Sequence, residues 1–359
     1  MNSVGVLFAG HRFHVSTDPA FAAVQEAHLG QFTAGPASAP ACGEHTYLEV
    51  QVDADLFTEH AARIAREPSQ TVVPFRAEPY QRARIGADTW WSPSPTTALP
   101  RDHLYFRDAS GRLMVLLHPD AVRGERYAMR VIREAVLRCA EHRGWTAFHA
   151  AAAALDDAGV LVTGPSGAGK TSVLAVLAAR HGADLVAADR AVVTADARTV
   201  AGVPMSVRIG AGTLAAVPPS TAMALRRPEP EPVFGSPRKA ALTPAQFTAA
   251  FGVRVRESVP LRLVLVPRLG EHTGAVRIRE LDATQARAAL AATCCTPYDE
   301  DWLEPWFAPR RRTVADLDRQ GQDLTARLVR EVLVLEAEAG IHHRGVLEQL
   351  ADAVAGRLR

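Results

Sequence analysis

Eight residues near the middle of the chain have the types and the order needed to hold a chain of phosphates. Residues 164–171, GPSGAGKT, match the pattern G-x-x-x-x-G-K-[ST], whose glycines let backbone N–H groups curl around phosphate oxygens. Lys170 would reach the β and γ oxygens, and the Thr171 hydroxyl could bind magnesium. The alternative, a glycine-rich turn that binds nothing, is disfavoured. We expect phosphate contacts from Gly164, Pro165, Ser166, Gly167, Ala168, Gly169, Lys170, Thr171 and Ser172.

The segments on either side of this loop are those that such a loop requires. The apolar run 160–163 predicts a strand before it, and 172–179 predicts a helix whose N-terminus adds its positive dipole end. Turn residues at 156–159 suggest that the strand is the second arm of a hairpin. The first arm, 149–154, is nearly all alanine, so the pattern leaves strand and helix open there.

A carboxylate follows the next apolar run. Asp189 comes directly after 185–188, which predicts a strand ending beside the loop. A carboxylate at that place could bind magnesium or accept a hydroxyl proton. The alternative is an aspartate that caps a helix or a turn. Arg190 could pair with this carboxylate or with phosphate.

Residues 145–195 resemble the HPr kinase group, whose catalytic domain is related to phosphoenolpyruvate carboxykinase. The resemblance is carried by His149, the hairpin, GPSGAGKT and LVAADRAVV. It implies an α/β P-loop domain that uses ATP and Mg²⁺ to phosphorylate a hydroxyl, usually a serine of a protein or peptide. By position, Lys170 and Thr171 would handle phosphate and metal, and His149 would orient or tune the Asp189 carboxylate.

The sequence departs from the group at one important position. Members typically have two adjacent acids after the loop, and here Ala188 stands in place of the first while Asp189 matches the second. In the group the two acids divide metal binding and proton abstraction between them. Here one carboxylate must do both, another residue must substitute, or activity is lost. Asp184 lies too early in the strand to be an obvious substitute. A nucleotide-binding regulator with little or no turnover, or a small-molecule kinase of the same fold, therefore remains an alternative.

The second lysine of the chain is a further candidate. Of 40 basic residues only Lys170 and Lys239 are lysine, and a lysine offers a compact charge that arginine cannot copy at a tight phosphate site. Kinases of the group that the sequence resembles often bring a basic residue from a downstream loop onto the transferred phosphate, and Lys239 or Arg238, at the end of the proline-rich loop 226–239, could do so here. The alternative is a solvated run of charge.

Outside the resemblance, periodicity predicts the remaining organisation. We expect a mixed α+β domain at 1–144, with a substrate-binding or partner-binding role that the sequence does not identify, and the catalytic domain at 145–359. In the first domain, 102–118 predicts a hairpin and 121–142 a helix. In the second, the expected elements are a strand at 261–269 and amphipathic helices at 314–338 and 344–358.

Composition excludes several classes of function. The 359 residues carry a formal net charge of +1, so no overall field favours nucleic acid or a membrane surface. Four cysteines without CxxC spacing predict neither a disulfide framework nor a zinc site, and we expect a cytoplasmic protein. The expected partner is a peptide or protein acceptor. A ribosomally made peptide precursor is the narrower expectation, since relatives with this core occur in such pathways. Homo-oligomerisation stays open.

Overall fold

The computed structural model consists of two compact units, each built on a mixed β-sheet with helices. The first unit is Met1–His142 with 310–313, and the second is Arg143–Pro297 with Val314–Arg359. The chain is thus a mixed α/β protein, as the sequence predicts. None of the described helices combines the length and the hydropathy that a membrane span requires. The structure describes residues 2–8, 11–29, 45–75, 78–121, 124–203, 205–215, 217, 239–297 and 310–358.

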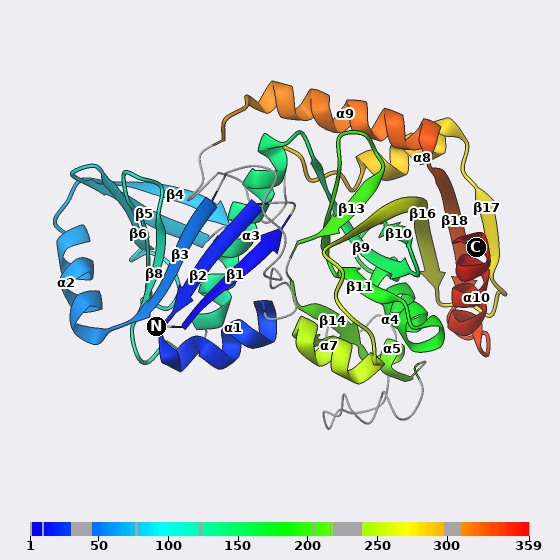
Figure 1. Ribbon diagram of the computed structural model, residues 1–359, viewed down its shortest axis with the longest axis horizontal. Coiled ribbons are helices and arrows are strands. Elements are labelled where there is room, and N and C mark those ends of the chain that lie inside the picture. The colour runs from blue at the N-terminus through cyan, green and yellow to red at the C-terminus, as the bar shows by residue number, and fades with distance from the viewer. Residues whose placement is uncertain are drawn as a thin grey trace. The chain divides into compact units, whose positions relative to one another are not determined.

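The first unit contains an eight-stranded sheet in the order β1-β2-β3-β8-β7-β6-β5-β4 (Figure 1). The pairs β2–β3 and β3–β8 are parallel and the other pairs are antiparallel. Its strands are β1 Asn2–Phe8, β2 His11–Thr17, β3 His45–Val52, β4 Ser69–Phe75, β5 Glu78–Ile85, β6 Asp88–Pro93, β7 His103–Arg107 and β8 Leu113–Leu117. Its helices are a 3-10 turn at Pro19–Phe21, α1 Ala22–Leu29, α2 Ala54–Ile64 and α3 Gly124–His142.

The hairpin predicted at 102–118 and the helix predicted at 121–142 are confirmed by β7, β8 and α3. Side chains of β7 alternate between the two faces of the sheet. Leu104 packs in the apolar cluster under α2, whereas His103 stacks on Tyr127 of α3. On that second face, His103 bridges Asp102 and the hydroxyl of Tyr80, at 2.9 and 2.8 Å. These bonds satisfy the polar groups that the sheet buries there.

The second unit contains a seven-stranded path, β10-β9-β12-β13-β16-β18-β17, with β11 beside β9 (Figure 1). Since β10 also pairs with β16, five of these strands close into a ring. The strands are β9 Thr146–Leu155, β10 Ala158–Thr163, β11 Asp184–Ala187, β12 Arg190–Val193, β13 Thr199–Gly202, β14 Val207–Gly210, β15 Lys239–Leu242, β16 Ser258–Gly270, β17 Arg277–Glu280 and β18 Leu333–Gly340. The helices are α4 Lys170–His181, α5 Ala211–Ala215, α7 Pro244–Phe251, α8 Ala283–Ala291, α9 Val314–Glu331 and α10 Val346–Leu358.

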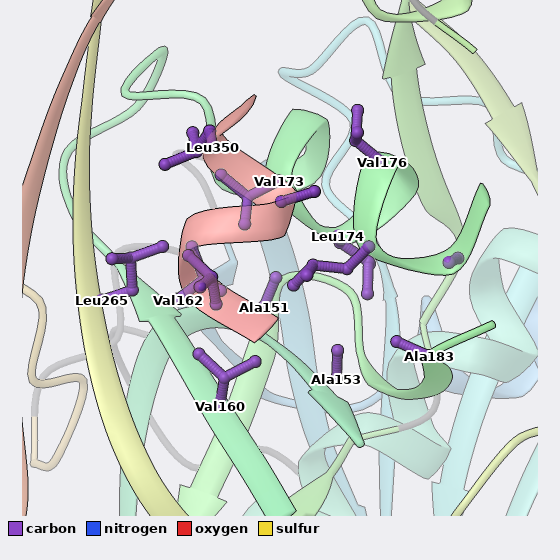
Figure 2. Close-up of a cluster of buried hydrophobic side chains, with 14 of the residues drawn as sticks. Ala151, Ala153, Val160, Val162, Val173, Leu174, Val176, Ala183, Leu265 and Leu350 are labelled. Carbon is purple, nitrogen blue, oxygen red and sulfur yellow. The ribbon is translucent and has the colours of Figure 1, made fainter. Parts of the chain in front are cut away.

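The alanine run that left strand and helix open is the strand β9. Its side chains alternate between two cores: Ala151 and Ala153 face α4 and α10, and Ala150 and Ala152 face the other side with α8 and α9. Figure 2 shows the first of these cores, where β9 and β10 meet Val173 and Leu174 of α4. Both faces of β9 are covered, and along 150–154 the methyl groups of alanine fill the space between them, whereas Phe148 and Leu155 are buried nearer the ends of the strand.

The helix predicted at 314–338 is wrong in its last third. Helix α9 ends at Glu331, and Leu333–Gly340 forms β18 between β16 and β17. Val334 and Leu335 point into opposite cores, and a continuous apolar run buried on both faces is typical of such a central strand. The apolar periodicity of the segment predicted a helix up to residue 338. That pattern carries no information about β16 and β17, the strands that pair with 333–340. The last predicted helix is confirmed by α10, and the strand predicted at 261–269 by β16.

Candidate functional site

The loop between β10 and α4, at 164–169, contains three glycines with positive φ. Gly164, Gly167 and Gly169 have φ angles of 151°, 84° and 103°, which residues other than glycine rarely adopt. A Cβ on Gly169 would lie 2.4 Å from the side chain of Leu269 on β16, so this position also lacks space. Pro165, Ser166 and Gly167 are exposed. The loop is therefore open to solvent and accessible to a ligand.

Lys170 is the first residue of helix α4, and its side chain folds back over the loop. Its Nζ donates hydrogen bonds to the carbonyls of Gly164 and Pro165, at 2.7 and 3.0 Å, and the residue is only 8% exposed. The ammonium charge and the positive end of α4 thus meet at one place. A phosphate chain suits this arrangement, because charge and backbone N–H groups are both supplied there.

The two hydroxyl residues after Lys170 have different surroundings. Thr171 is half-buried in the first turn of α4. The buried Ser172 instead forms a 2.7 Å hydrogen bond between its hydroxyl and that of Thr213 on α5. Ser172 can therefore offer a phosphate its backbone N–H, while its hydroxyl joins the loop helix to α5.

His149 and Asp189 are brought together by the pairing of β9 with β12. In this ladder Arg190 lies opposite His149, and the amide of Ala150 donates to the carbonyl of Asp189 at 3.1 Å. The side chains then meet, with Nε2 of His149 3.2 Å from Oδ1 of Asp189. The proximity that the resemblance implied for these two residues is present in the structure.

A second cation holds the other oxygen of Asp189. The guanidinium of Arg190, whose side chain is 3% exposed, lies 2.7 Å from Oδ2, so Arg190 makes the carboxylate pairing that the sequence left open. Burial by itself would raise the pKa of Asp189. The hydrogen bond from His149 and the charges of Arg190, His149 and Lys170 outweigh it, and this pKa lies well below its ordinary value. Asp189 is an ionised carboxylate in the field of the loop lysine.

Ala188 and Asp184, the two positions considered for a second acid, both lie in surroundings that give them other roles. Ala188 is 7% exposed and packs in the core under α4, so that its Cβ points away from solvent. Asp184 accepts a hydrogen bond from the amide of Arg254 at 2.8 Å, at the far end of β11. Among the described residues, no group of three or more His, Cys, Asp or Glu side chains could hold a metal ion. Magnesium bound here would rely on few protein oxygens and on phosphate oxygens, as it commonly does.

Lys239 begins β15 and is exposed. It pairs with Gly210 of β14, the residue directly before α5, whose Thr213 contacts Ser172. Lys239 is thus joined to α4 through the backbone of β14 and α5 and the hydroxyl bond between Thr213 and Ser172. Arg238 and the rest of the predicted loop before it lie outside the described residues.

Thr293 is a neighbour of the site that sequence reasoning missed. It follows α8, and its hydroxyl accepts a 2.7 Å hydrogen bond from Thr163, the last residue of β10 before the loop. Its carbonyl also accepts from the amide of His149 at 2.8 Å. No local signal marks this threonine, because its partners are far from it in the sequence.

Sequence comparison adds no assignment to this geometry. No family model matches the chain, and no curated protein sequence is significantly similar to it.

Proposed function

We propose that the second unit is an HPr kinase-like catalytic domain that binds ATP with Mg²⁺ and transfers the γ-phosphoryl group to a hydroxyl of a peptide or protein. The observation that carries the proposal is that Lys170, held over the loop, lies near enough for its charge to act on an ionised Asp189 that is fixed by His149 and Arg190. A cytoplasmic protein whose acceptor is a serine, as in a ribosomally made peptide precursor, fits this chemistry.

The residues of the loop fit a triphosphate. Bound ATP with magnesium would supply the phosphoryl group and part of the charge neutralisation. Lys170 would exchange the carbonyls of Gly164 and Pro165 for β and γ oxygens. The Thr171 hydroxyl and one Asp189 oxygen are hard ligands of the kind that magnesium prefers.

Asp189 would act as an ionised carboxylate, because the hydrogen bond from His149 and the nearby cations lower its pKa. A weakly basic carboxylate orients the acceptor hydroxyl by accepting its hydrogen bond, and it removes no proton beforehand. The bond from the acceptor oxygen to phosphorus forms as the bond to the ADP oxygen breaks. The hydroxyl proton then passes to the Asp189–His149 pair. Positioning and charge neutralisation thus supply most of the rate.

Lys239 is proposed to neutralise charge on the phosphoryl group in transfer. Its strand is linked to α4 through Thr213, so a movement of β15 over the loop would bring its ammonium toward the phosphate. The variant Lys239→Ala should then lower turnover more than ATP affinity. If the turnover of Lys239→Ala equalled that of the wild type, Lys239 would be a solvated charge with no part in the transfer.

The test of the function is transfer of label from γ-labelled ATP in the presence of magnesium, with and without serine-containing peptides. Transfer to a peptide that is lost in Lys170→Ala would support the proposal. Arg319→Ala on α9 is the control, since this side chain is 68% exposed and should not matter. Transfer only to small alcohols would favour a small-molecule kinase. ATP affinity unchanged in Lys170→Ala would contradict the assignment of the loop.

A second candidate function, a nucleotide-binding regulator without turnover, is favoured by one observation. Ala188, where the HPr kinase group has its first acid, is packed in the core. Asp189→Asn separates the two candidates. In a kinase it should abolish turnover and spare nucleotide affinity, whereas a regulator has no turnover to lose.

A further inference from the structure

We propose that Thr293 is a positioning residue that ties the start of the phosphate loop to the strand carrying His149. This inference rests on the proposed function and extends it to a residue with no expected part in phosphate binding. Thr293 lies between α8 and the strands, where it contacts residues of β9 and β10 through different atoms.

The first tie is a chain of hydroxyl hydrogen bonds. Thr163 donates to the Thr293 hydroxyl at 2.7 Å, and Thr293 donates onward to the carbonyl of Leu290 in the last turn of α8, at 3.2 Å. Carbonyls in the last turn of a helix have no partner within the helix, and this one also accepts from the backbone amide of Thr293 at 3.2 Å. The end of β10 is thereby fixed to the end of α8.

The second tie is through the backbone. The Thr293 carbonyl accepts from the amide of His149 at 2.8 Å, and Phe148 forms an isolated bridge with Cys294. One residue thus holds the strand end before Gly164 and the residue that binds Asp189. These two ties add to the direct pairing of β10 with β9, in which Thr163 lies opposite Ala150.

Burial makes the hydroxyl pair sensitive to substitution. Thr163 is fully buried and Thr293 is 5% exposed, so water cannot replace a lost partner without rearrangement. If the Thr293 hydroxyl is removed, the hydroxyl of Thr163 keeps only a long 3.4 Å bond to the carbonyl of His149. If the Thr163 hydroxyl is removed, that of Thr293 loses its donor and keeps its bond to the carbonyl of Leu290. A shift of Thr163 is passed on at once to Gly164, because the two residues are adjacent.

The matched control is Thr296, in the same segment and equally buried at 5%. Its hydroxyl also anchors β9, accepting from the amide of Ala147 at 3.0 Å, but it touches neither Thr163 nor His149 in the described contacts. Thr296→Val should therefore lower the thermal unfolding midpoint as Thr293→Val does, without the same effect on the loop.

The experiment measures MgATP affinity by calorimetry and kcat and KM by label transfer. Thr293→Val and Thr163→Val should each weaken MgATP binding by about five- to tenfold, the equivalent of one lost buried hydrogen bond. Thr293→Ser, which keeps the hydroxyl, should stay within about twofold of the wild type. The double variant Thr163→Val/Thr293→Val should bind no more weakly than either single variant, since the shared bond is already absent.

Different failures point to different conclusions. Wild-type affinity in Thr293→Val, or an equal loss in Thr296→Val, would overturn the role of Thr293 and leave the kinase proposal standing. A wild-type protein that binds no MgATP would overturn the proposed function and this inference together.

Discussion

The Nε2 atom of His149 lies 3.2 Å from Oδ1 of Asp189, and the two side chains come from β9 and from the junction of β11 with β12. Arg190, the next residue in the chain, takes the other oxygen at 2.7 Å. A carboxylate held by two groups in this way has a fixed direction. The fixed direction is what a group that orients a substrate hydroxyl or a metal ion requires.

The first prediction concerns pH. Burial opposes ionisation of Asp189, yet its bond from His149 and the nearby cations lower its pKa from an ordinary 3.8. The stability this carboxylate contributes is fully present above about pH 5 and is lost as the pH falls through 3.8 toward the folded value. Between pH 7 and pH 3, the wild type should lose more unfolding free energy than Asp189→Asn. Urea titrations at both pH values measure the difference.

The control for this prediction is Asp157→Asn. The Asp157 side chain is 92% exposed, and an exposed ion pair contributes little to stability. This variant should keep the pH dependence of the wild type. If Asp189→Asn also kept it, the strong interactions of the Asp189 carboxylate would be disproved.

The second prediction concerns Gly169, where both the φ of 103° and contact with Leu269 disfavour a Cβ. Gly169→Ala should lower the unfolding free energy by about 1–3 kcal/mol and weaken nucleotide binding, because the loop must distort. Gly210→Ala is the matched control, since nothing lies within 4 Å of the added carbon. Thermal unfolding and calorimetry with MgATP would distinguish the two variants. Equal stability and equal MgATP affinity of Gly169→Ala and Gly210→Ala would argue against the loop conformation seen at Gly169.

The third prediction concerns restoration of the missing acid. Because Ala188 is packed in the core, Ala188→Asp should lower the unfolding free energy by about 1–3 kcal/mol or more, as an unpaired buried charge does. It should not raise turnover. Ala249→Asp, at an exposed position of α7, should leave stability nearly unchanged. A stable Ala188→Asp variant with higher turnover would show that the position is accessible to the site.

The fourth prediction concerns the link between α4 and α5. Replacement of Ser172 by alanine removes a buried hydroxyl bond to Thr213 and should cost about 1 kcal/mol. Thr213→Val should cost a similar amount, and the double variant less than the sum, since both changes break one bond. Chemical denaturation of the four proteins measures the coupling. Strict additivity would mean that the two hydroxyls do not interact.

The part of the site that could be predicted from sequence is the part made by adjacent residues. The phosphate loop, its strand and its helix follow one another, so their glycines and Lys170 are readable as a pattern. The contact of His149 with Asp189 was expected from resemblance alone. Thr213 and Thr293 could not be found, because their partners are brought to them by sheet closure.

The same distinction explains the fold. The hairpin at β7 and β8 is local and was predicted, with its turn residues between the strands. Strand β18 was taken for the end of a helix, because its character comes from β16 and β17 on either side. A pattern within one segment reports which face is apolar, but it does not report which neighbour will cover that face.

The alanines of β9 set how closely the helices on its two faces approach each other near the site. With a methyl group as the largest side chain at 150–154, α4 on one face and α9 on the other can both contact this strand. A bulkier residue anywhere in the run would force one helix layer outward. On the α4 face, Lys170 would move with its helix while His149 stayed with its strand. The alanine methyl groups of β9 therefore set the distance between Lys170 on α4 and the Asp189 carboxylate held by His149.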